Sequence, residues 1–438
     1  MSVTYTPEQS AAIGARGKTV VSASAGSGKT FVMIEKLVSL ILSEADIGDF
    51  LAVTFTNKAA AQMREKLKKA LIAKIGDKSL TERERSSLKR KLALLPQADI
   101  STIHAFCGRL IRRYFYLLGV PADFEILGES AEGMTLANKA MDALFEEAYA
   151  AGEDDFFALL SVYRRKRSDR GVRDVISQLY AKIRPMANYR EILSQARYDR
   201  AGFEAVLRGL TEIYVEKFRR RRQRAALLAE GILNMPRAQE FYDKIDFWMN
   251  RAIACPDYYE LRSVCMASFP DKPRKRKDTS PAEADLFDAL GTIKNDLSKL
   301  AKEIAGGGER EEEYARYEEA GKIARALIRY TLRFDELYEA VKKERGKLDY
   351  NDLEHMTLRL LGEPDVLAEL RAKYKYVFVD EYQDVNPVQE FIINGVLPDK
   401  AFMVGDVKQS IYAFRLADPG IFLKRRSDYE NGGGEDGD

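Results

Sequence analysis

The stretch VVSASAGSGKTFVMIEKL, residues 20–37, decides the fold because it joins an apolar strand, a glycine-rich turn and a helix. After the turn, apolar side chains recur at the i, i+3, i+4 and i+7 positions of an amphipathic helix. The turn fits the phosphate-loop pattern G-x-x-x-x-G-K-[ST] at Gly28, Lys29 and Thr30, although Ala23 replaces the first glycine. The flanking strand and helix favour a phosphate-binding loop over a turn that binds nothing.

The residue types in this loop suit the binding of a nucleotide. Glycines let backbone N–H groups curl around phosphate oxygens, and the N-terminus of the following helix adds partial positive charge. Lys29 is expected to reach the β- and γ-phosphates of ATP, and Thr30 to bind Mg²⁺. The residues predicted to contact the nucleotide here are Ala25, Gly26, Ser27, Gly28, Lys29 and Thr30.

A second apolar strand, near the other end of the chain, ends in two acids, Asp380 and Glu381. Ligands of open parallel sheets bind at the carboxyl ends of the strands. Asp380 is therefore expected to hold Mg²⁺, and Glu381 to activate the water that attacks ATP. An acidic strand exit is common by itself, but the phosphate loop favours the catalytic interpretation.

The order of strand and helix patterns predicts an α/β fold. Short β-rich runs occur at 18–22, 50–55, 98–103, 375–380 and 400–405, and helical patterns follow most of them. Such alternation indicates a parallel sheet covered on both faces. The middle of the chain is charged, rich in Leu and Ala, and poor in strand signals. The predicted parts are a P-loop NTPase domain at 1–126 and 348–426, a mostly helical inserted domain at 127–347, and a flexible tail at 427–438.

Composition sets the broad class. The chain has 438 residues, 46% of them hydrophobic, and a net charge of +2 from 70 basic and 68 acidic side chains. That balance argues neither for nor against nucleic acid, so local clusters must decide. The basic runs at 163–170, 217–224 and 271–278 are compatible with contact to duplex DNA or with solvated helix faces that carry counter-charges.

Cysteine use and hydropathy predict a cytosolic protein. Cys107, Cys255 and Cys265 have no CxxC spacing, which fits a reducing compartment. The N-terminus has no signal-peptide pattern, and no uncharged apolar run approaches the roughly 18 residues of a transmembrane helix. We therefore expect a cytoplasmic protein with no membrane partner.

The ordered motifs resemble those of superfamily 1 DNA helicases of the UvrD/Rep/RecB group. The phosphate loop and the paired acids are joined by YTPEQSAAI (5–13), LAVTFTNKAAAQMREKL (51–67), ISTIHAFCGRLIRR (100–113), LDYNDLE (348–354) and DVKQSIYAFRLADP (406–419). These look like the Q motif, motif Ia, motif Ib, the return into the first motor domain, and motif III. The resemblance implies a RecA-like motor domain that uses ATP and Mg²⁺ and binds DNA.

Within this group the sequence is most similar to the AddA family, which belongs to bacterial two-component helicase–exonucleases. The segments VDEYQDVNPVQ and GDVKQSIYAFRLADPGIF carry this similarity, and Phe31 stands where UvrD proteins usually have Arg. The resemblance implies action on single- and double-stranded DNA in double-strand break repair and recombination, with an AddB-type partner protein. The alternatives left open are a naturally short UvrD-like helicase and a non-enzymatic DNA-binding module.

The resemblance also implies roles for particular residues. Gln9 is expected to read the adenine edge, and Gln409 to sense the γ-phosphate and complete the catalytic set with Lys29 and Glu381. Aromatic side chains stack bases, and polar ones donate to phosphates. The predicted DNA-binding residues are Phe55, Thr56, Asn57, Lys58, His104, Tyr412, Phe414 and Arg415. The plainer interpretation is that the aromatic residues belong to the core and His104 is structural.

A complete motor of this group would carry further parts. Motifs IV, V and VI of a second motor domain, with their arginines, and a nuclease domain are not found in the sequence. We therefore expect an N-terminal piece that binds ATP–Mg²⁺ and single-stranded DNA but hydrolyses little ATP and unwinds nothing alone.

Overall fold

The computed structural model describes residues 5–24, 26–128, 130–163, 168–232, 235–274, 276, 279–397, 399–409 and 419–430. They belong to two compact units. Unit 1 comprises Met1–Phe156, Leu160–Glu191 and Arg329–Asp438, and unit 2 comprises Phe157–Leu159 and Ile192–Ile328. Each unit is described by itself.

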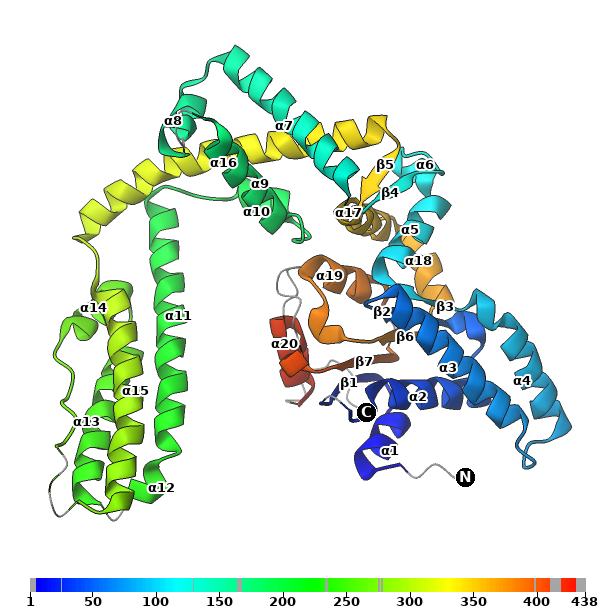
Figure 1. The fold of residues 1–438 in the computed structure, drawn as a ribbon, viewed down its shortest axis with the longest axis horizontal. Coiled ribbons are helices and arrows are strands. Elements are labelled where there is room, and N and C mark those ends of the chain that lie inside the picture. Colours follow the sequence, from blue (N-terminus) through cyan, green and yellow to red (C-terminus); the bar gives the residue numbers. More distant parts are fainter. Residues whose placement is uncertain are drawn as a thin grey trace. The chain divides into compact units, whose positions relative to one another are not determined.

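Unit 1 is built on a five-stranded parallel sheet (Figure 1). Its strands, in spatial order, are β1 (Lys18–Ser22), β7 (Ala401–Gly405), β6 (Tyr376–Val379), β2 (Phe50–Thr54) and β3 (Asp99–Thr102). The register places Val20 beside Met403, and Ala52 beside both Phe378 and Ile100. The predicted α/β fold with a parallel sheet is confirmed, and each of the five predicted strand runs contains one strand.

Alternation along the strands gives the sheet two apolar faces, each covered by helices. On β6, Tyr376 and Phe378 face one core, whereas Val377 and Val379 face the other. The first core contains residues of α2 (Lys29–Ser43), α3 (Asn57–Ile75) and α4 (Glu82–Leu94). The second contains residues of α5 (Ile103–Arg113), α17 (Tyr350–Leu361), α18 (Pro364–Lys373) and α19 (Pro387–Val396).

The α/β part has several further elements. They are α1 (Pro7–Gly14), η1 (Ile47–Asp49), η2 (Leu95–Gln97), α6 (Phe115–Leu118), η3 (Tyr382–Asp384), η4 (Val407–Gln409) and α20 (Pro419–Glu430). The structure places residues 427–430 in α20. The flexible tail expected at 427–438 remains a prediction, because residues 431–438 lie outside the described residues. The α20 helix packs on the second core through the fully buried Phe422, a contact that local composition does not reveal.

The chain leaves the α/β part through β4 (Glu125–Leu127) and returns through β5 (Lys347–Asp349). The two strands pair in parallel, so the ends of the insertion lie side by side. The helices between them that contribute to unit 1 are α7 (Ala131–Ala151), α8 (Asp154–Tyr163), α9 (Arg170–Ile183), α10 (Tyr189–Ser194) and α16 (Arg310–Glu344). The domain boundaries expected at 127 and 347 remain a prediction, because the compact units divide the chain at other points.

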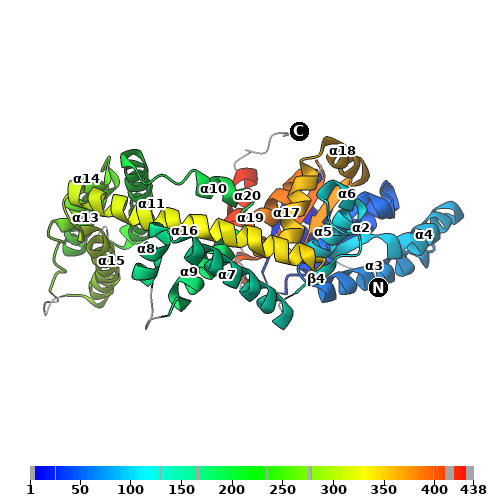
Figure 2. The ribbon, with the colours of Figure 1, turned by 90° about the horizontal axis from the view of Figure 1, so that it is seen from above.

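Buried ion pairs explain why some inserted helices group with the sheet. Arg184, at the end of α9, donates to Asp352 of α17 at 2.8 Å. Lys342 of α16 lies 2.5 Å from both Asp349 and Asp352. Buried charges are stable only when they are paired, so these contacts fasten α9 and α16 to α17. Figure 2 shows α16 as one continuous helix; its residues up to Ile328 belong to unit 2.

Among its described residues, unit 2 has helices joined by loops and no strand. Its other helices are α11 (Arg200–Ala226), α12 (Ala229–Ile232), α13 (Pro236–Ile253), α14 (Tyr258–Met266) and α15 (Pro281–Ala305). They pack around a core of their own that includes Phe218, Trp248 and Leu297. The mostly helical character predicted for the insertion is therefore confirmed.

Candidate nucleotide and DNA-binding site

The sheet order brings the predicted motifs to one edge. Because all five strands are parallel, the segments that follow them leave from the same edge. Across that edge the order is the phosphate loop after β1, residues 406–409 after β7, the acids after β6, residues 55–58 after β2, and the start of α5 directly after β3. The predicted nucleotide residues therefore lie on one half of the edge, and the described DNA-binding candidates lie on the other.

The phosphate loop has the backbone that its glycines predict. Gly26 and Gly28 have φ angles of 77° and 84°, in the left-handed region that glycine adopts without strain. Among the described residues, Glu381 is the only non-glycine residue with a positive φ. Ala23, which replaces the first glycine of the phosphate-loop pattern, therefore has a negative φ and an unstrained backbone. Ala25, also predicted to contact the nucleotide, lies outside the described residues.

Gln9 lies beside this loop. Its Nε2 donates to the carbonyl oxygen of Ser27 at 3.2 Å, and its Oε1 accepts from the backbone N–H of Thr6 at 3.1 Å. An amide oxygen accepts two hydrogen bonds and an amide nitrogen donates two, so each atom keeps one further position. The structure thus brings the predicted adenine-reading residue next to the predicted phosphate loop.

Lys29 is placed to receive an anion. Its ammonium lies 3.9 Å from Oε2 of Glu381, and its side chain is 10% exposed. The ammonium nitrogen is buried and has no hydrogen-bond partner among the described residues. A buried ammonium without an acceptor is costly, and the glycine cradle in front of α2 lies beside it. The chemistry of this donor set fits a phosphate group. Thr30 is the second residue of α2.

The paired acids are held in different ways. The backbone N–H of Asp380 donates to Val53 at 2.9 Å and continues the sheet, whereas Glu381 has a φ of 52° in the left-handed region. Such strain in a non-glycine residue is typical of functional sites. Burial, followed by the charge of Glu381, raises the pKa of Asp380 to about 6.

The acids suit Mg²⁺ better than a metal held by protein ligands alone. Among the described residues, no group of three His, Cys, Asp or Glu side chains could hold a metal ion. Mg²⁺ is usually bound by one or two carboxylates together with water and substrate phosphates. Asp380 and Thr30 are compatible with that arrangement when a nucleotide supplies the phosphate oxygens.

Gln383 connects the acids to the segment after β7, and sequence reasoning missed it. Its side chain is 1% exposed and donates to Glu381 at 2.9 Å. Its Oε1 accepts the backbone N–H of Asp406 at 2.8 Å. The amide of Gln409 donates to the Asp406 carboxylate, which lowers the pKa of that acid. Gln383 stands two residues after Glu381, but its role depends on β6 and β7 being neighbours.

The turn after β2 carries four predicted DNA-binding residues. The Thr56 hydroxyl caps α3 by accepting the N–H of Ala59 at 3.1 Å, so it also has a structural task. Asn57 and Lys58 are exposed in the first helical turn, and Phe55 is half-buried. This turn presents polar donors beside an aromatic ring at the edge of the sheet.

His104 is held by α17, a contact that sequence reasoning did not anticipate. Its Nε2 lies 3.0 Å from Oε1 of Glu354, whose side chain is 2% exposed. The same oxygen accepts from Gln389 of α19 at 2.7 Å. The His104 ring lies against Tyr350, with centroids 4.5 Å apart. His104 therefore has a structural partner and an aromatic neighbour, on the half of the edge that carries the predicted DNA-binding residues. The sequence motifs at 100–113 and 348–354 contain these two residues, but the sequence did not reveal that they are in contact.

Three further DNA-binding candidates, Tyr412, Phe414 and Arg415, lie outside the described residues. The described basic run of α11 is partly neutralised by acids of unit 2. Its ion pairs are Arg219 and Arg220 with Glu216, Arg222 with Asp246, and Arg224 with Asp296. These counter-charges favour the interpretation of a solvated helix face.

The remaining expectations from composition can be compared with the structure. No helix among the described residues is both long and apolar enough to cross a bilayer. Cys107 and Cys265 are buried, Cys255 is half-buried, and all three are free thiols. His355 of α17 has its Nε2 2.6 Å from the carbonyl oxygen of Arg184.

Comparisons with known proteins agree with this arrangement. Residues 5–430 match the family model described as the UvrD/REP helicase N-terminal domain. The A subunits of ATP-dependent helicase/nucleases are 33% identical to this chain in Alkaliphilus oremlandii, 34% in Alkaliphilus metalliredigens and 33% in Bacillus licheniformis. Each alignment covers 99% of this chain and 37% of the relative. The chain thus spans somewhat more than a third of the length of these relatives.

Proposed function

We propose that this chain, which belongs to the UvrD/REP helicase N-terminal domain family, is the ATP- and single-stranded-DNA-binding part of a DNA helicase motor. The observation that carries the proposal is the Lys29 ammonium. It is buried, has no hydrogen-bond partner among the described residues, and follows the two left-handed glycines of the phosphate loop. A phosphate would supply the missing acceptor.

The roles at the nucleotide half follow from position and chemistry. Lys29 binds the β- and γ-phosphates, and Gln9 pairs with the adenine edge. Thr30 and Asp380 hold Mg²⁺, which neutralises the charge of the phosphates when it is bound. Glu381 accepts a proton from the attacking water. Gln383 holds Glu381, and its contact with Asp406 supports a path from these acids to Gln409.

Single-stranded DNA is assigned to the other half of the same edge. Phe55 and the His104–Tyr350 pair supply stacking surfaces, while Asn57 and Lys58 supply donors for phosphates. The assignment of Tyr412, Phe414 and Arg415 to this track rests on the sequence resemblance. Glu354 contacts both His104 and Gln389. Gln389 lies in α19, the helix that follows the acids, so Glu354 supports a physical connection between the nucleotide half and the DNA half of the edge.

The wider activity is proposed from the relatives. Their description as ATP-dependent helicase/nucleases supports a helicase and nuclease activity. Its action on single- and double-stranded DNA in repair and recombination is proposed from the sequence resemblance. Because the relatives are A subunits, their description also supports an AddB-type partner protein. The organisms of the relatives and the three free thiols support the bacterial cytoplasm as location.

Nucleotide titration of the purified chain, with and without Mg²⁺, tests this function. Lys29→Ala is expected to weaken ATP binding by at least tenfold, because it removes a charged donor from a buried site. Single-stranded DNA binding should remain and should weaken steeply with salt, as phosphate contacts do. Lys375→Ala is a matched control, since Lys375 pairs with Asp49 at the start of the sheet. Absence of ATP binding by the unmodified chain would refute the proposal.

A further inference from the structure

The α1 helix, which carries Gln9, is held by a small set of contacts. Ala12 and Ile13 pack, partly buried, against the core that contains α2, and polar contacts hold both ends of the helix. It has eight residues, and none of them is buried. A surface helix this short has little packing energy of its own, so its position depends on specific contacts. This matters because the amide of Gln9 must be held where the base of a nucleotide would lie.

One tie lies near the N-terminal end of α1. The Tyr5 hydroxyl donates to Oε2 of Glu35 at 2.6 Å, and the ring of Tyr5 lies 5.9 Å from that of Phe31. Glu35 and Phe31 both belong to α2. The hydrogen bond to Glu35 raises the pKa of Tyr5 to about 12, so the hydroxyl stays a donor at neutral pH. Gln9 adds a tie of its own to the phosphate loop through Ser27.

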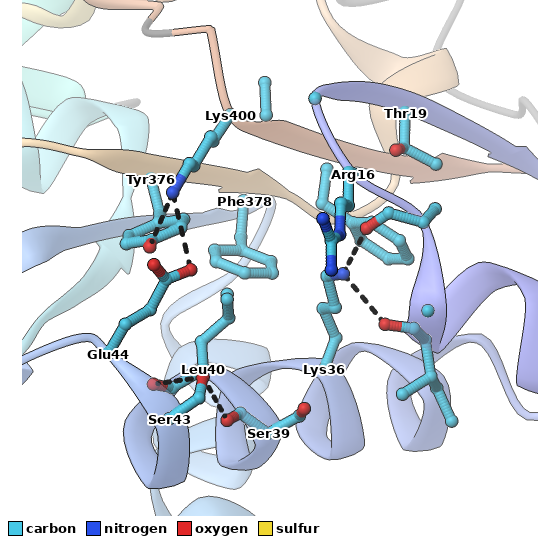
Figure 3. Close-up of a pocket in the computed structure, with 16 residues that line it drawn as sticks. Arg16, Thr19, Lys36, Ser39, Leu40, Ser43, Glu44, Tyr376, Phe378 and Lys400 are labelled. Atoms are coloured by element: carbon cyan, nitrogen blue, oxygen red, sulfur yellow. Dashed lines mark hydrogen bonds and ion pairs between the residues drawn. The ribbon is translucent and has the colours of Figure 1, made fainter.

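A second tie lies at the C-terminal end of α1 and is made by Lys36, also from α2. Its ammonium donates to the carbonyl oxygens of Ile13, at 2.8 Å, and Ala15. Figure 3 shows both bonds, with the Lys36 side chain rising from α2 toward the end of α1. A cation at the last carbonyls of a helix is favourable because these oxygens lack partners within the helix.

We infer that Lys36 and Tyr5 are positioning residues for nucleotide base recognition, holding α1 so that Gln9 stays in register with the phosphate loop. Lys36 belongs to α2, and Tyr5 binds Glu35 of α2, so both contacts connect the α1 region to the helix whose N-terminus forms the predicted phosphate site. The inference rests on the proposed function, because it takes Gln9 to be the base-reading residue.

The cavity next to Lys36 does not offer a better explanation for this lysine. It has a volume of about 570 Å³ and lies at the amino ends of β6 and β7, away from the phosphate loop. Of its two lysines, Lys36 is engaged with the end of α1, and Lys400 with Glu44 and the Tyr376 hydroxyl (Figure 3). Both ammonium groups therefore already have protein acceptors. We assign the lysine to α1 and propose no ligand for the cavity.

The test compares ATP, GTP and tripolyphosphate as ligands of the full chain. The amide of Gln can pair with the N6 and N7 positions of adenine, whereas guanine presents two acceptors there. Lys36→Met should weaken ATP by about three- to tenfold and lower the preference for ATP over GTP, as loss of one or two hydrogen bonds predicts. Binding of tripolyphosphate, which has no base, should stay within twofold. Tyr5→Phe should act in the same direction, and Gln9→Ala gives the reference effect.

Lys400→Met is the matched control because it removes the other lysine of the same cavity without touching α1. It should leave all three affinities unchanged. Amide hydrogen exchange gives a second readout, independent of nucleotide: Lys36→Met should speed exchange in residues 7–14 while α2 is unaffected.

The outcomes separate the two levels of the proposal. If Gln9→Ala lowers the ATP preference but Lys36→Met changes neither the preference nor the exchange of α1, the positioning inference is overturned and base reading stands. Equal loss of ATP and tripolyphosphate in Lys36→Met would also overturn it, since the phosphate loop would then be the affected part. If Gln9→Ala leaves the preference unchanged, the base-reading role fails and the inference fails with it.

Discussion

Replacing Asp380 by Asn should stabilise unit 1 at neutral pH, although the carboxylate is assigned to Mg²⁺. Burial and the neighbouring Glu381 raise its pKa to about 6, from an ordinary value of 3.8. The folded chain therefore binds this proton more tightly than the unfolded chain does. Stability falls as pH rises from about 4 to about 6, and the loss is complete above the folded pKa.

The size of this effect follows from the two pKa values. Their difference corresponds to about 3 kcal/mol at most, and partial solvent access reduces it to about 1–3 kcal/mol. The free energy of unfolding of Asp380→Asn minus that of the unmodified chain should be near zero at pH 4. It should reach about 1–3 kcal/mol at pH 8. Glu381→Gln should shrink the pH dependence, because it removes the second cause of the shift.

The assay is urea unfolding without nucleotide or Mg²⁺ at pH values from 4 to 8, followed by far-ultraviolet circular dichroism. Trp248, the single tryptophan of the chain, lies in unit 2, so its fluorescence reports that unit separately. The difference between the variants should appear in the transition of unit 1 alone. A flat difference across this range, or greater stability of the unmodified chain at pH 8, would refute the reasoning about Asp380.

Two further predictions concern contacts between motifs. Glu354→Gln should weaken single-stranded DNA binding several-fold if it orients His104, and should have no effect in a His104→Ala background; additive losses measured by fluorescence anisotropy would contradict this. Gly405→Ala should cost about 1–3 kcal/mol in urea unfolding, because an added Cβ would lie 2.6 Å from Oε1 of Gln383. Gly48→Ala is its control, since no atom lies within 4 Å of the added Cβ, and equal effects of the two substitutions would contradict the steric argument.

The edge of the sheet gives these predictions a common basis. Gln383 joins the acids to the segment after β7, while Glu354 joins the helix after the acids to His104. Each of these side chains is almost fully buried. Buried polar side chains that make several hydrogen bonds hold one geometry, because an unsatisfied alternative is costly. These contacts connect the half of the edge proposed to bind the nucleotide with the half proposed to bind DNA.

Local sequence was sufficient to predict the pieces of this protein. The strand, turn and helix around Lys29 depend on hydrophobic periodicity and on glycines that reach the left-handed region, both of which act over a few residues. The same holds for β6 and the acids that follow it. The five strands, the parallel α/β class and the helical insertion were predicted on this basis and are confirmed.

Only the tertiary structure decided which pieces meet. The pairing of β1 with β7, and of β2 with β6, joins segments from opposite ends of the chain. That pairing places Glu381 3.9 Å from Lys29. Gln383, Glu354 and Lys36 act through partners distant in sequence, and their own neighbours carry no signal for those contacts. The physical reason is that periodicity and turn chemistry are local, whereas a buried hydrogen bond depends on how the strands and helices pack.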